Sequence, residues 1–146
     1  MSTFPIVLKG LALLTSAVSA QHLALGLQAD ALLGIELAAT VAGDPGLSSQ
    51  NRYFGVSYLI FAAVYWLASR DLDRFRPVLV CALAITFAAG LSRLVPWFAY
   101  GAPPPAVVGL LVVEILAPPL LLLWMPRSKQ SGDVQRVVTR TPNRRS

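Results

Sequence analysis

Four long apolar segments, separated by shorter polar or charged stretches, make up most of the chain. They cover residues of about 5–27, 51–69, 77–95 and 106–125. A helix rises about 1.5 Å per residue, so about 20 apolar residues cross the roughly 30 Å hydrocarbon layer of a bilayer. The pattern predicts an all-α integral membrane protein, with one domain over residues 1–126 that forms a bundle of four antiparallel spanning helices.

The composition supports this class and narrows the chemistry. Hydrophobic residues make up 55% of the chain and charged residues 13%, whereas soluble domains carry about 25% charged residues. The single cysteine, Cys81, excludes an internal disulfide and a CxxC site, and the single histidine excludes a histidine-rich metal site. We therefore expect neither a bound metal nor a cofactor.

The stretches between the apolar segments predict the connections. Residues 28–50 are acidic and end in Gly43-Asp44-Pro45-Gly46, which favours either a helix on the membrane surface or an extension of the first helix, closed by a turn. Residues 70–76 are short and charged, so we expect a loop, with Pro77 in the first turn of the third helix. Residues 96–105, rich in aromatic residues and proline, predict another loop.

The first apolar segment has two interpretations. The small residues Val18-Ser19-Ala20 are typical of a signal-peptide cleavage site. Lys9 inside the apolar run, the lack of a basic segment before it and the renewed hydrophobicity through Leu27 argue for an uncleaved first helix, which we expect.

The distribution of basic residues predicts the orientation. Lys9, the three arginines of residues 70–76 and the six basic residues of residues 127–146 lie on one side of the predicted bundle. The positive-inside rule places this side, and both termini, in the cytoplasm. Residues 127–146 are predicted to form a disordered basic tail that contacts anionic lipid and not nucleic acid, since no aromatic residues accompany its charges.

Two charges inside apolar segments mark the polar centre of the protein. An ionised side chain at mid-membrane costs about 2.5–3.5 kcal/mol, so Arg93 and Glu114 need partners. Their depths on oppositely running helices bring them together, because helix side chains lean toward the N-terminus. Pro118 has no N–H group, so the main-chain carbonyl of Glu114 lacks its helical hydrogen bond. We expect Arg93 to donate to this carbonyl, because its guanidinium has N–H groups beyond those that the carboxylate uses.

Other polar residues lie at similar depth in the predicted outer half. The first helix offers a small and polar face, Thr15, Ser19, His22 and Gly26, of the kind that favours helix contacts in lipid. The whole candidate binding set is Glu114, Arg93, Asn51, Arg52, His22 and Tyr58. Arg52 alone is also explained by contact with lipid headgroups.

This cluster permits three roles. It could be a buried network that holds the helices in one arrangement, or a cavity that binds a small or lipid-like molecule. It could also serve an enzyme or transporter that uses Glu114 with Arg93 and His22. No nucleophile with a neighbouring base is apparent, so we assign no catalytic residue. We expect a non-enzymatic role, as an accessory subunit of a membrane protein partner or as a small-ligand binder.

Several short motifs resemble a known family. They are Asn51-Arg52-Tyr53-Phe54-Gly55 opening the second helix, Gly90-Leu91-Ser92-Arg93 closing the third, Gly101 in the outer loop, and Glu114 followed by Pro118 on the fourth. From about Pro5 to Pro126 the chain resembles the bacterial family of small four-helix membrane proteins described as domain of unknown function 4345. The resemblance implies four helices, a multi-pass inner-membrane location and a polar set of Asn51, Arg52, Arg93 and Glu114; it implies no activity.

Overall fold

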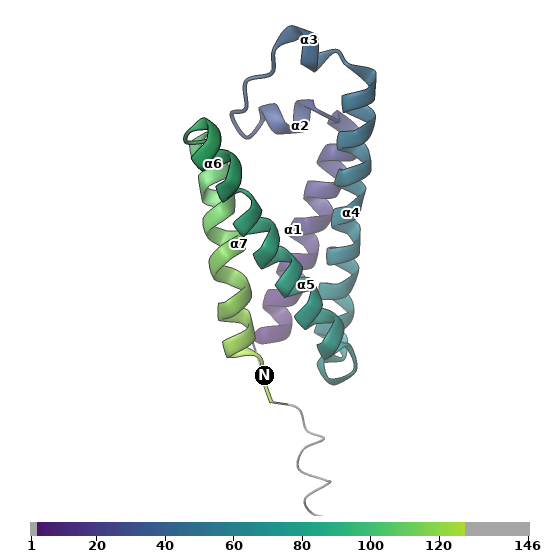
Figure 1. The fold of residues 1–146 in the computed structure, drawn as a ribbon. Coiled ribbons are helices and arrows are strands. Elements are labelled where there is room, and N and C mark those ends of the chain that lie inside the picture. The colour runs from purple at the N-terminus through teal and green to yellow at the C-terminus, as the bar shows by residue number, and fades with distance from the viewer. Residues whose placement is uncertain (1–2, 128–146) are drawn as a thin grey trace, which may run out of the picture.

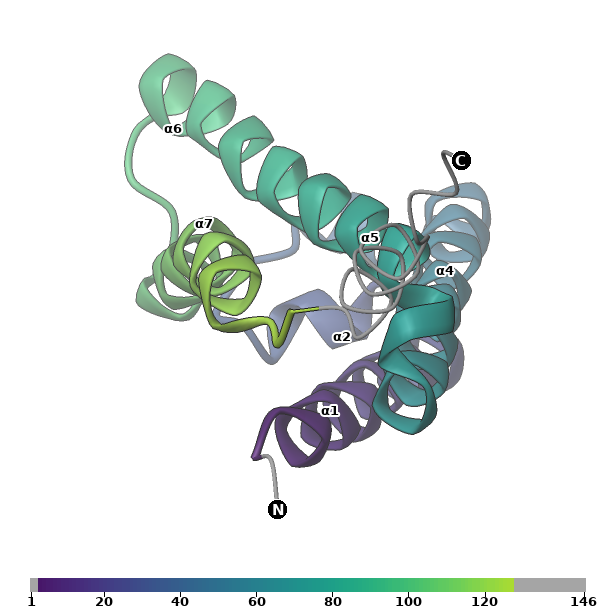
Figure 2. The ribbon, with the colours of Figure 1, turned by 90° about the horizontal axis from the view of Figure 1, so that it is seen from below.

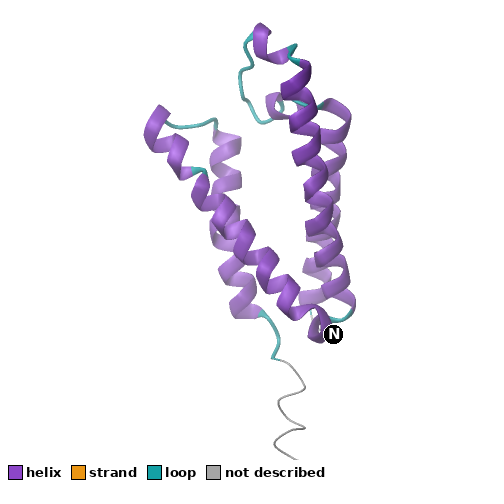
Figure 3. Ribbon diagram, turned by 45° about the vertical axis from the view of Figure 1, so that its right-hand side comes forward, coloured by secondary structure: helices purple, strands orange, loops and turns teal. Residues whose placement is uncertain are grey.

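The computed structural model describes residues 3–127, and every regular element in this range is a helix (Figure 3). The four longest helices are α1 (Phe4–Leu25), α4 (Pro45–Arg70), α5 (Leu72–Ser92) and α7 (Pro105–Trp124). Three short helices are α2 (Gln28–Ala31), α3 (Ala39–Ala42) and α6 (Leu94–Tyr100). The predicted all-α fold is confirmed, and the predicted tail lies outside the described residues apart from Arg127.

Three helical stretches within residues 3–127 are long and apolar enough to cross a membrane. They are Phe4–Leu25, Leu72–Tyr100 and Pro105–Trp124. Helix α4 contains the second predicted span, residues 51–69, but its first turns are polar and lower its mean hydropathy. The membrane character predicted from the sequence therefore stands for three of the four segments.

The long helices form two pairs, as Figures 1 and 2 show. Helix α1 packs along α4, and α5 packs against α7. Contacts between α4 and α5 join the pairs, and α5 crosses obliquely from the last turn of α4 toward α7 (Figure 1). The pairs therefore meet most closely where α4 ends and α5 begins.

A cluster of buried apolar side chains holds the pairs together at this end. It combines the start of α1, the end of α4, the start of α5 and the end of α7, through Phe4, Leu8, Ala12, Tyr65, Ala68, Leu79, Leu83 and Leu121. The ring of Trp124 packs edge-on against Phe4, with 5.7 Å between the ring centroids. We call this the apolar end; the opposite end, which carries α2, α3 and α6, is the polar end.

The prediction of a loop over residues 70–76 is wrong. Only Asp71 separates α4 from α5, and its side chain accepts a hydrogen bond from the main-chain N–H of Arg74 at 3.1 Å. This N-cap starts α5 at Leu72, because it satisfies one of the free N–H groups of the first turn. Pro77 consequently lies inside α5 instead of in its first turn.

The segment over residues 28–50 adopts neither predicted form. Helix α1 ends at Gly26, whose φ of 58° favours glycine, and the chain then forms only the single turns of α2 and α3. Asp44 accepts a hydrogen bond from the N–H of Leu47 at 2.8 Å and Pro45 occupies the first helical turn, so α4 begins before the predicted span. We call residues 26–44 the α1–α4 connection.

The predicted loop over residues 96–105 is also partly helical. Helix α6 covers its first half, as far as Tyr100, and Gly101 with a φ of 103° ends this helix. Pro96 has no N–H to offer the carbonyl of Ser92, so the helical path breaks at Arg93, between α5 and α6. This break places Arg93 at the junction of two helices.

Candidate functional site

The centre of the polar end is an ion pair between Arg93 and Glu114. Arg93 Nε donates to Glu114 Oε2 at 2.6 Å, and Nη2 donates to Oε1 at 2.9 Å. This two-bond geometry is the strong form of an arginine–carboxylate pair. The predicted pairing is confirmed, and it ties the α5–α6 junction to the middle of α7.

Gly90 lets α5 approach α7 closely enough for this pair to form. A Cβ atom at Gly90 would lie 2.9 Å from the Cβ of Glu114 and 3.1 Å from its carbonyl carbon. Such contacts are too short for any larger residue without movement of the backbone. The glycine one turn before Arg93 therefore sets the spacing on which the ion pair depends.

Pro118 and Pro119 lie inside α7, as the predicted break in its hydrogen bonding requires. Neither proline can donate to the carbonyls of Glu114 and Ile115. The expectation that Arg93 would donate to the Glu114 carbonyl is not met, because both hydrogen bonds from its guanidinium go to the carboxylate. The carboxylate is the stronger acceptor, since it is charged.

A second polar group forms around Asp30 on the other helix pair. Asn51 Nδ2 donates to Asp30 Oδ2 at 2.7 Å, and His22 Nε2 lies 3.6 Å from Asp30 Oδ1. The sequence pattern indicated His22 and Asn51 as site residues, but not Asp30. In the sequence, Asp30 is visible only as an acidic residue soon after an apolar segment. Its position against α1 and α4 depends on how the α1–α4 connection folds.

Arg52 contacts the end of α1 through hydrogen bonds to main-chain carbonyls. Its Nη1 donates to the main-chain carbonyl of Ala24 at 3.0 Å and also to that of Leu23. The last carbonyls of a helix have no partners within the helix, and they carry partial negative charge. Arg52 therefore has protein partners at the end of α1, and its contact with lipid headgroups stays a prediction.

Tyr58 lies between the two polar groups. Its ring is 6.0 Å from the His22 ring, and its hydroxyl is within electrostatic reach of Arg93, Glu114 and Asp30. Gly55, one turn before Tyr58, lies directly against the His22 side chain, where a Cβ would overlap it. The structure thus gathers the whole predicted set at the polar end, although in two groups with different partners.

The residues that form the two polar groups lie in a region that matches a known protein family. The family described as domain of unknown function (DUF4345) matches residues 3–125. The chain belongs to this family. The match includes every residue of the two polar groups and confirms the resemblance inferred from the short motifs. No curated protein and no solved structure matches the chain.

The DUF4345 chain has a pocket beside the ion pair, between α6 and α7. Its volume is about 260 Å³. The lining residues are Arg93, Pro96, Trp97, Tyr100, Gly101, Pro103 and Val107. Arg93 is the charged member of this lining, and the remaining walls are apolar, aromatic or proline. The sequence favoured a cavity at the polar cluster as one alternative, but it grouped most of these lining residues only as an outer loop.

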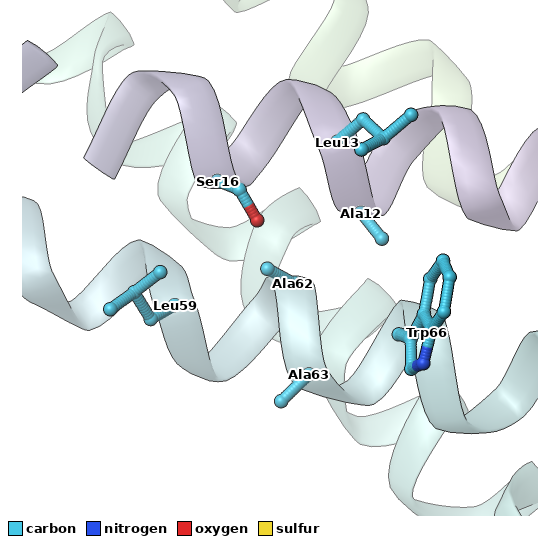
Figure 4. A pocket seen from close by; sticks show the side chains of 7 residues that line it. All are labelled: Ala12, Leu13, Ser16, Leu59, Ala62, Ala63 and Trp66. Carbon is cyan, nitrogen blue, oxygen red and sulfur yellow. The ribbon is translucent and has the colours of Figure 1, made fainter. Parts of the chain in front are cut away.

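A second hollow in the DUF4345 chain is a groove between α1 and α4 (Figure 4). Its volume is about 310 Å³. Its lining is apolar apart from Ser16, and consists of Ala12, Leu13, Ser16, Leu59, Ala62, Ala63 and Trp66. Figure 4 shows Ser16 of α1 directed toward Ala62 of α4, and Ala12 of α1 on the side of the groove near Trp66. The groove lies along the outside of the α1/α4 pair, away from the ion pair.

Within residues 3–127 of the DUF4345 chain, no group of three or more His, Cys, Asp or Glu side chains is placed to hold a metal ion. The histidine and its acidic neighbour Asp30 supply two such groups, whereas a structural zinc site needs four. The polar end offers hydrogen bonds and charge instead.

Proposed function

We propose that this chain is a bacterial inner-membrane protein whose four long helices all cross the bilayer in alternating directions. Three of these helices are apolar enough by themselves, and the part of α4 from Tyr53 onward continues as a mainly apolar run. Lys9, Arg70, Arg74 and Arg76 lie toward the apolar end. Basic residues favour the cytoplasmic side, so the apolar end and both termini are placed there, and the polar end faces outward.

The proposed role is non-enzymatic: the protein binds a small amphiphilic molecule at the pocket between α6 and α7. The observation that carries this proposal is the apolar and aromatic pocket with Arg93 in its wall. Ligand sites are commonly apolar hollows with a few fixed polar groups. At about 260 Å³ the pocket suits a small ring or the end of a lipid-like molecule.

The ion pair favours a neutral polar group on that ligand. Glu114 already balances the charge of Arg93, so a second anion would compete with this carboxylate. A guanidinium has five N–H donors, and two of them serve Glu114. A carbonyl or hydroxyl oxygen of the ligand can accept from Arg93 while the apolar part packs against Trp97 and Tyr100.

The alternative, an enzyme or transporter that uses Glu114 with Arg93 and His22, has less support. In such an enzyme or transporter, the acid and the base would have to reach the same substrate. Instead, Glu114 is engaged by Arg93, and His22 lies beside Asp30 on the other helix pair. Each titratable group therefore has its own partner.

Native mass spectrometry of the protein, extracted in a mild detergent from its own membranes, tests the binding role. The wild-type chain should carry a bound molecule that is absent from Trp97→Ala, which removes a pocket wall. Phe98→Ala is the matched control, because Phe98 is the next residue of α6, is 85% exposed and does not line the pocket. This control should retain the molecule.

Arg93→Lys separates ligand binding from folding. Lysine keeps the charge near Glu114 but loses the two parallel hydrogen bonds, so the fold should persist while ligand retention falls. A wild-type chain that emerges without any bound molecule would contradict the proposal. Equal retention in Trp97→Ala and Phe98→Ala would contradict the assignment to this pocket.

The groove between α1 and α4 favours a second candidate role, as an accessory subunit of another membrane protein. Small residues let helices approach closely in lipid, and the half-buried Ser16 and the exposed Ala63 provide such a surface above the buried Ala12 and Ala62 (Figure 4). A partner helix in this groove should be recovered in stoichiometric amount by a mild-detergent pull-down. Ala63→Leu should lose it, whereas Ala84→Leu on α5 should not; an empty pull-down from native membranes would contradict this role.

A further inference from the structure

The groove between α1 and α4 is followed by a basic side chain on each helix. Lys9 precedes Leu13 by four residues on α1, and Arg70 follows Trp66 by four residues on α4. Residues four apart in a helix lie on the same face, so Lys9 and Arg70 continue the two walls of the groove. In Figure 4, Trp66 lies at the same end of the groove as Ala12 and Leu13. Both basic residues therefore lie beyond this one end, where α1 begins and α4 ends.

The position of the Arg70 side chain is set by its neighbour in the groove. Its guanidinium carbon lies 5.1 Å from the centroid of the Trp66 ring. The face of an indole ring attracts a cation, and helix side chains lean toward the start of their helix. For Arg70, at the end of α4, that direction is toward the groove. The charge is therefore held beside the wall that Trp66 forms.

Both charges are available to a binding partner. Lys9 and Arg70 are exposed, and no ion pair within residues 3–127 includes them. The two acids of the adjacent turn have other partners, because Asp71 caps α5 and Asp73 lies 3.8 Å from Arg76. The groove thus has an apolar lining and, at one end, two cations without a carboxylate partner in the described part of the chain.

The depth of these cations suits a lipid headgroup. Lys9 lies five residues into α1, and its side chain leans toward the start of that helix, which is toward the membrane surface. The aliphatic stem of a lysine can pack along apolar surface while its ammonium group reaches the polar layer. Arg70 is the last residue of α4. Both charges therefore reach the level of the phosphates, and the apolar groove lies deeper in the membrane.

We propose that this groove holds one acyl chain of an anionic phospholipid, whose phosphate lies between Lys9 and Arg70. The groove extends over the seven residues from Leu59 to Trp66, or about 10 Å, within the roughly 15 Å depth of one leaflet. Its volume of about 310 Å³ receives part of a chain, and the remainder of the lipid stays in the bilayer. In the orientation proposed above, this lipid belongs to the inner leaflet.

A partner helix, as in the second candidate role, would fill the same groove, so the two occupants exclude each other. The charges favour the lipid. A phosphate neutralises Lys9 and Arg70 together, since lysine and arginine are the usual phosphate-binding side chains. The apolar face of a partner helix would leave both cations without a counter-ion. This inference does not depend on ligand binding at the α6/α7 pocket.

Competition between two phospholipids tests the charged end of the site. The full chain, purified free of lipid in a mild detergent, receives equal amounts of phosphatidylglycerol and phosphatidylcholine with identical acyl chains. Native mass spectrometry then measures both complexes, and we expect the wild type to prefer phosphatidylglycerol. Lys9→Gln and Arg70→Gln should each lower this preference about fivefold, the contribution of one basic residue near a membrane surface.

Arg74→Gln is the matched control for the loss of charge. Arg74 is an exposed arginine of α5, its guanidinium carbon lies 5.5 Å from the centroid of the Phe75 ring, and it belongs to neither wall of the groove. This variant should keep the preference of the wild type. The double variant Lys9→Arg with Arg70→Lys retains both charges and should also keep it, which separates the effect of charge from an effect on folding.

Ala63→Leu tests the acyl-chain part of the site. Its larger side chain fills the groove, so binding of both phospholipids should fall. Ala84→Leu is the control, because Ala84 is an exposed alanine of α5 outside the groove; it should bind both lipids as the wild type does.

Four results would overturn the proposal. Equal binding of the two lipids by the wild type would show that the site does not recognise the anionic headgroup. An unchanged preference in both glutamine variants would place the anionic contact elsewhere. Unchanged lipid binding in Ala63→Leu would show a headgroup contact that does not use the groove. A wild type that takes up neither lipid would leave the groove to a partner helix.

Discussion

The two ends of the molecule are held together in different ways. At the apolar end, buried side chains from α1, α4, α5 and α7 form one continuous cluster, in which Leu8 and Leu79 are fully buried. At the polar end, α5 and α7 are joined by the two hydrogen bonds between Arg93 and Glu114, and α1 and α4 by contacts around Asp30 and Arg52. One end relies on packing, the other on a few directed bonds.

This difference suggests a division of roles. Packing has little directional preference, so the apolar end stabilises the bundle without fixing the orientation of any polar group. Directed hydrogen bonds fix the orientation of side chains. The loss of one partner leaves the other polar group without a hydrogen bond, which lowers the free energy of unfolding. The polar end is therefore where ligand binding is expected, and mutations at the two ends should have different effects on stability and on ligand retention.

The largest effect should come from Arg93→Ala. It leaves the Glu114 carboxylate, 17% exposed, without its base, and breaking such a pair lowers the free energy of unfolding by about 3 kcal/mol. Reversible unfolding in mixed detergent micelles measures this loss. The double variant Arg93→Ala with Glu114→Gln should regain part of it, because no unpaired charge remains; no recovery would mean that the cost lies elsewhere.

Leu79→Ala tests the apolar end. The Leu79 side chain is fully buried, and the cavity left by its removal should cost about 2 kcal/mol. Leu123→Ala is the control, since Leu123 on α7 is 85% exposed and should be close to neutral. Ligand retention in native mass spectrometry should survive Leu79→Ala in the folded fraction. Its loss would contradict the separation of the two ends.

Gly90→Ala tests the spacing on which the ion pair depends. The new Cβ would crowd Glu114, and such overpacking should cost about 1.5 kcal/mol in the same unfolding measurement. Gly109→Ala in α7 meets nothing within 4 Å and should be neutral or slightly stabilising. The effects of Gly90→Ala and Arg93→Ala should be non-additive; simple additivity would show that Gly90 acts independently of the pair.

The smallest effect should come from Asp44→Ala, outside both clusters. It removes the cap on the first turn of α4, which should cost about 1 kcal/mol. Asp44→Asn keeps an accepting oxygen and should be nearly neutral. Thermal unfolding followed by circular dichroism can compare the two. An equal loss in both variants would indicate that the charge of Asp44, and not its hydrogen bond, stabilises α4.

The sequence alone was sufficient for the membrane class, the helical fold and the central ion pair. Apolar length and composition decide whether a segment prefers lipid, and neither depends on tertiary contacts. Arg93 and Glu114 could be paired because a charge in an apolar segment requires a partner, and the side chains of these two residues converge from oppositely running helices. The short motifs also identified the family correctly.

Tertiary structure alone decided how the polar residues were divided and what lay between the helices. Asp30 became part of the site because the α1–α4 connection folds back, and Arg52 turned to the end of α1 because that helix stops at Gly26. The helical form of the charged segment before Pro77 is a different case, because it follows from a local cap at Asp71 and not from tertiary contacts. Periodicity and charge give the depth of a residue along a helix, but the partner of a polar side chain depends on how the connections fold in three dimensions.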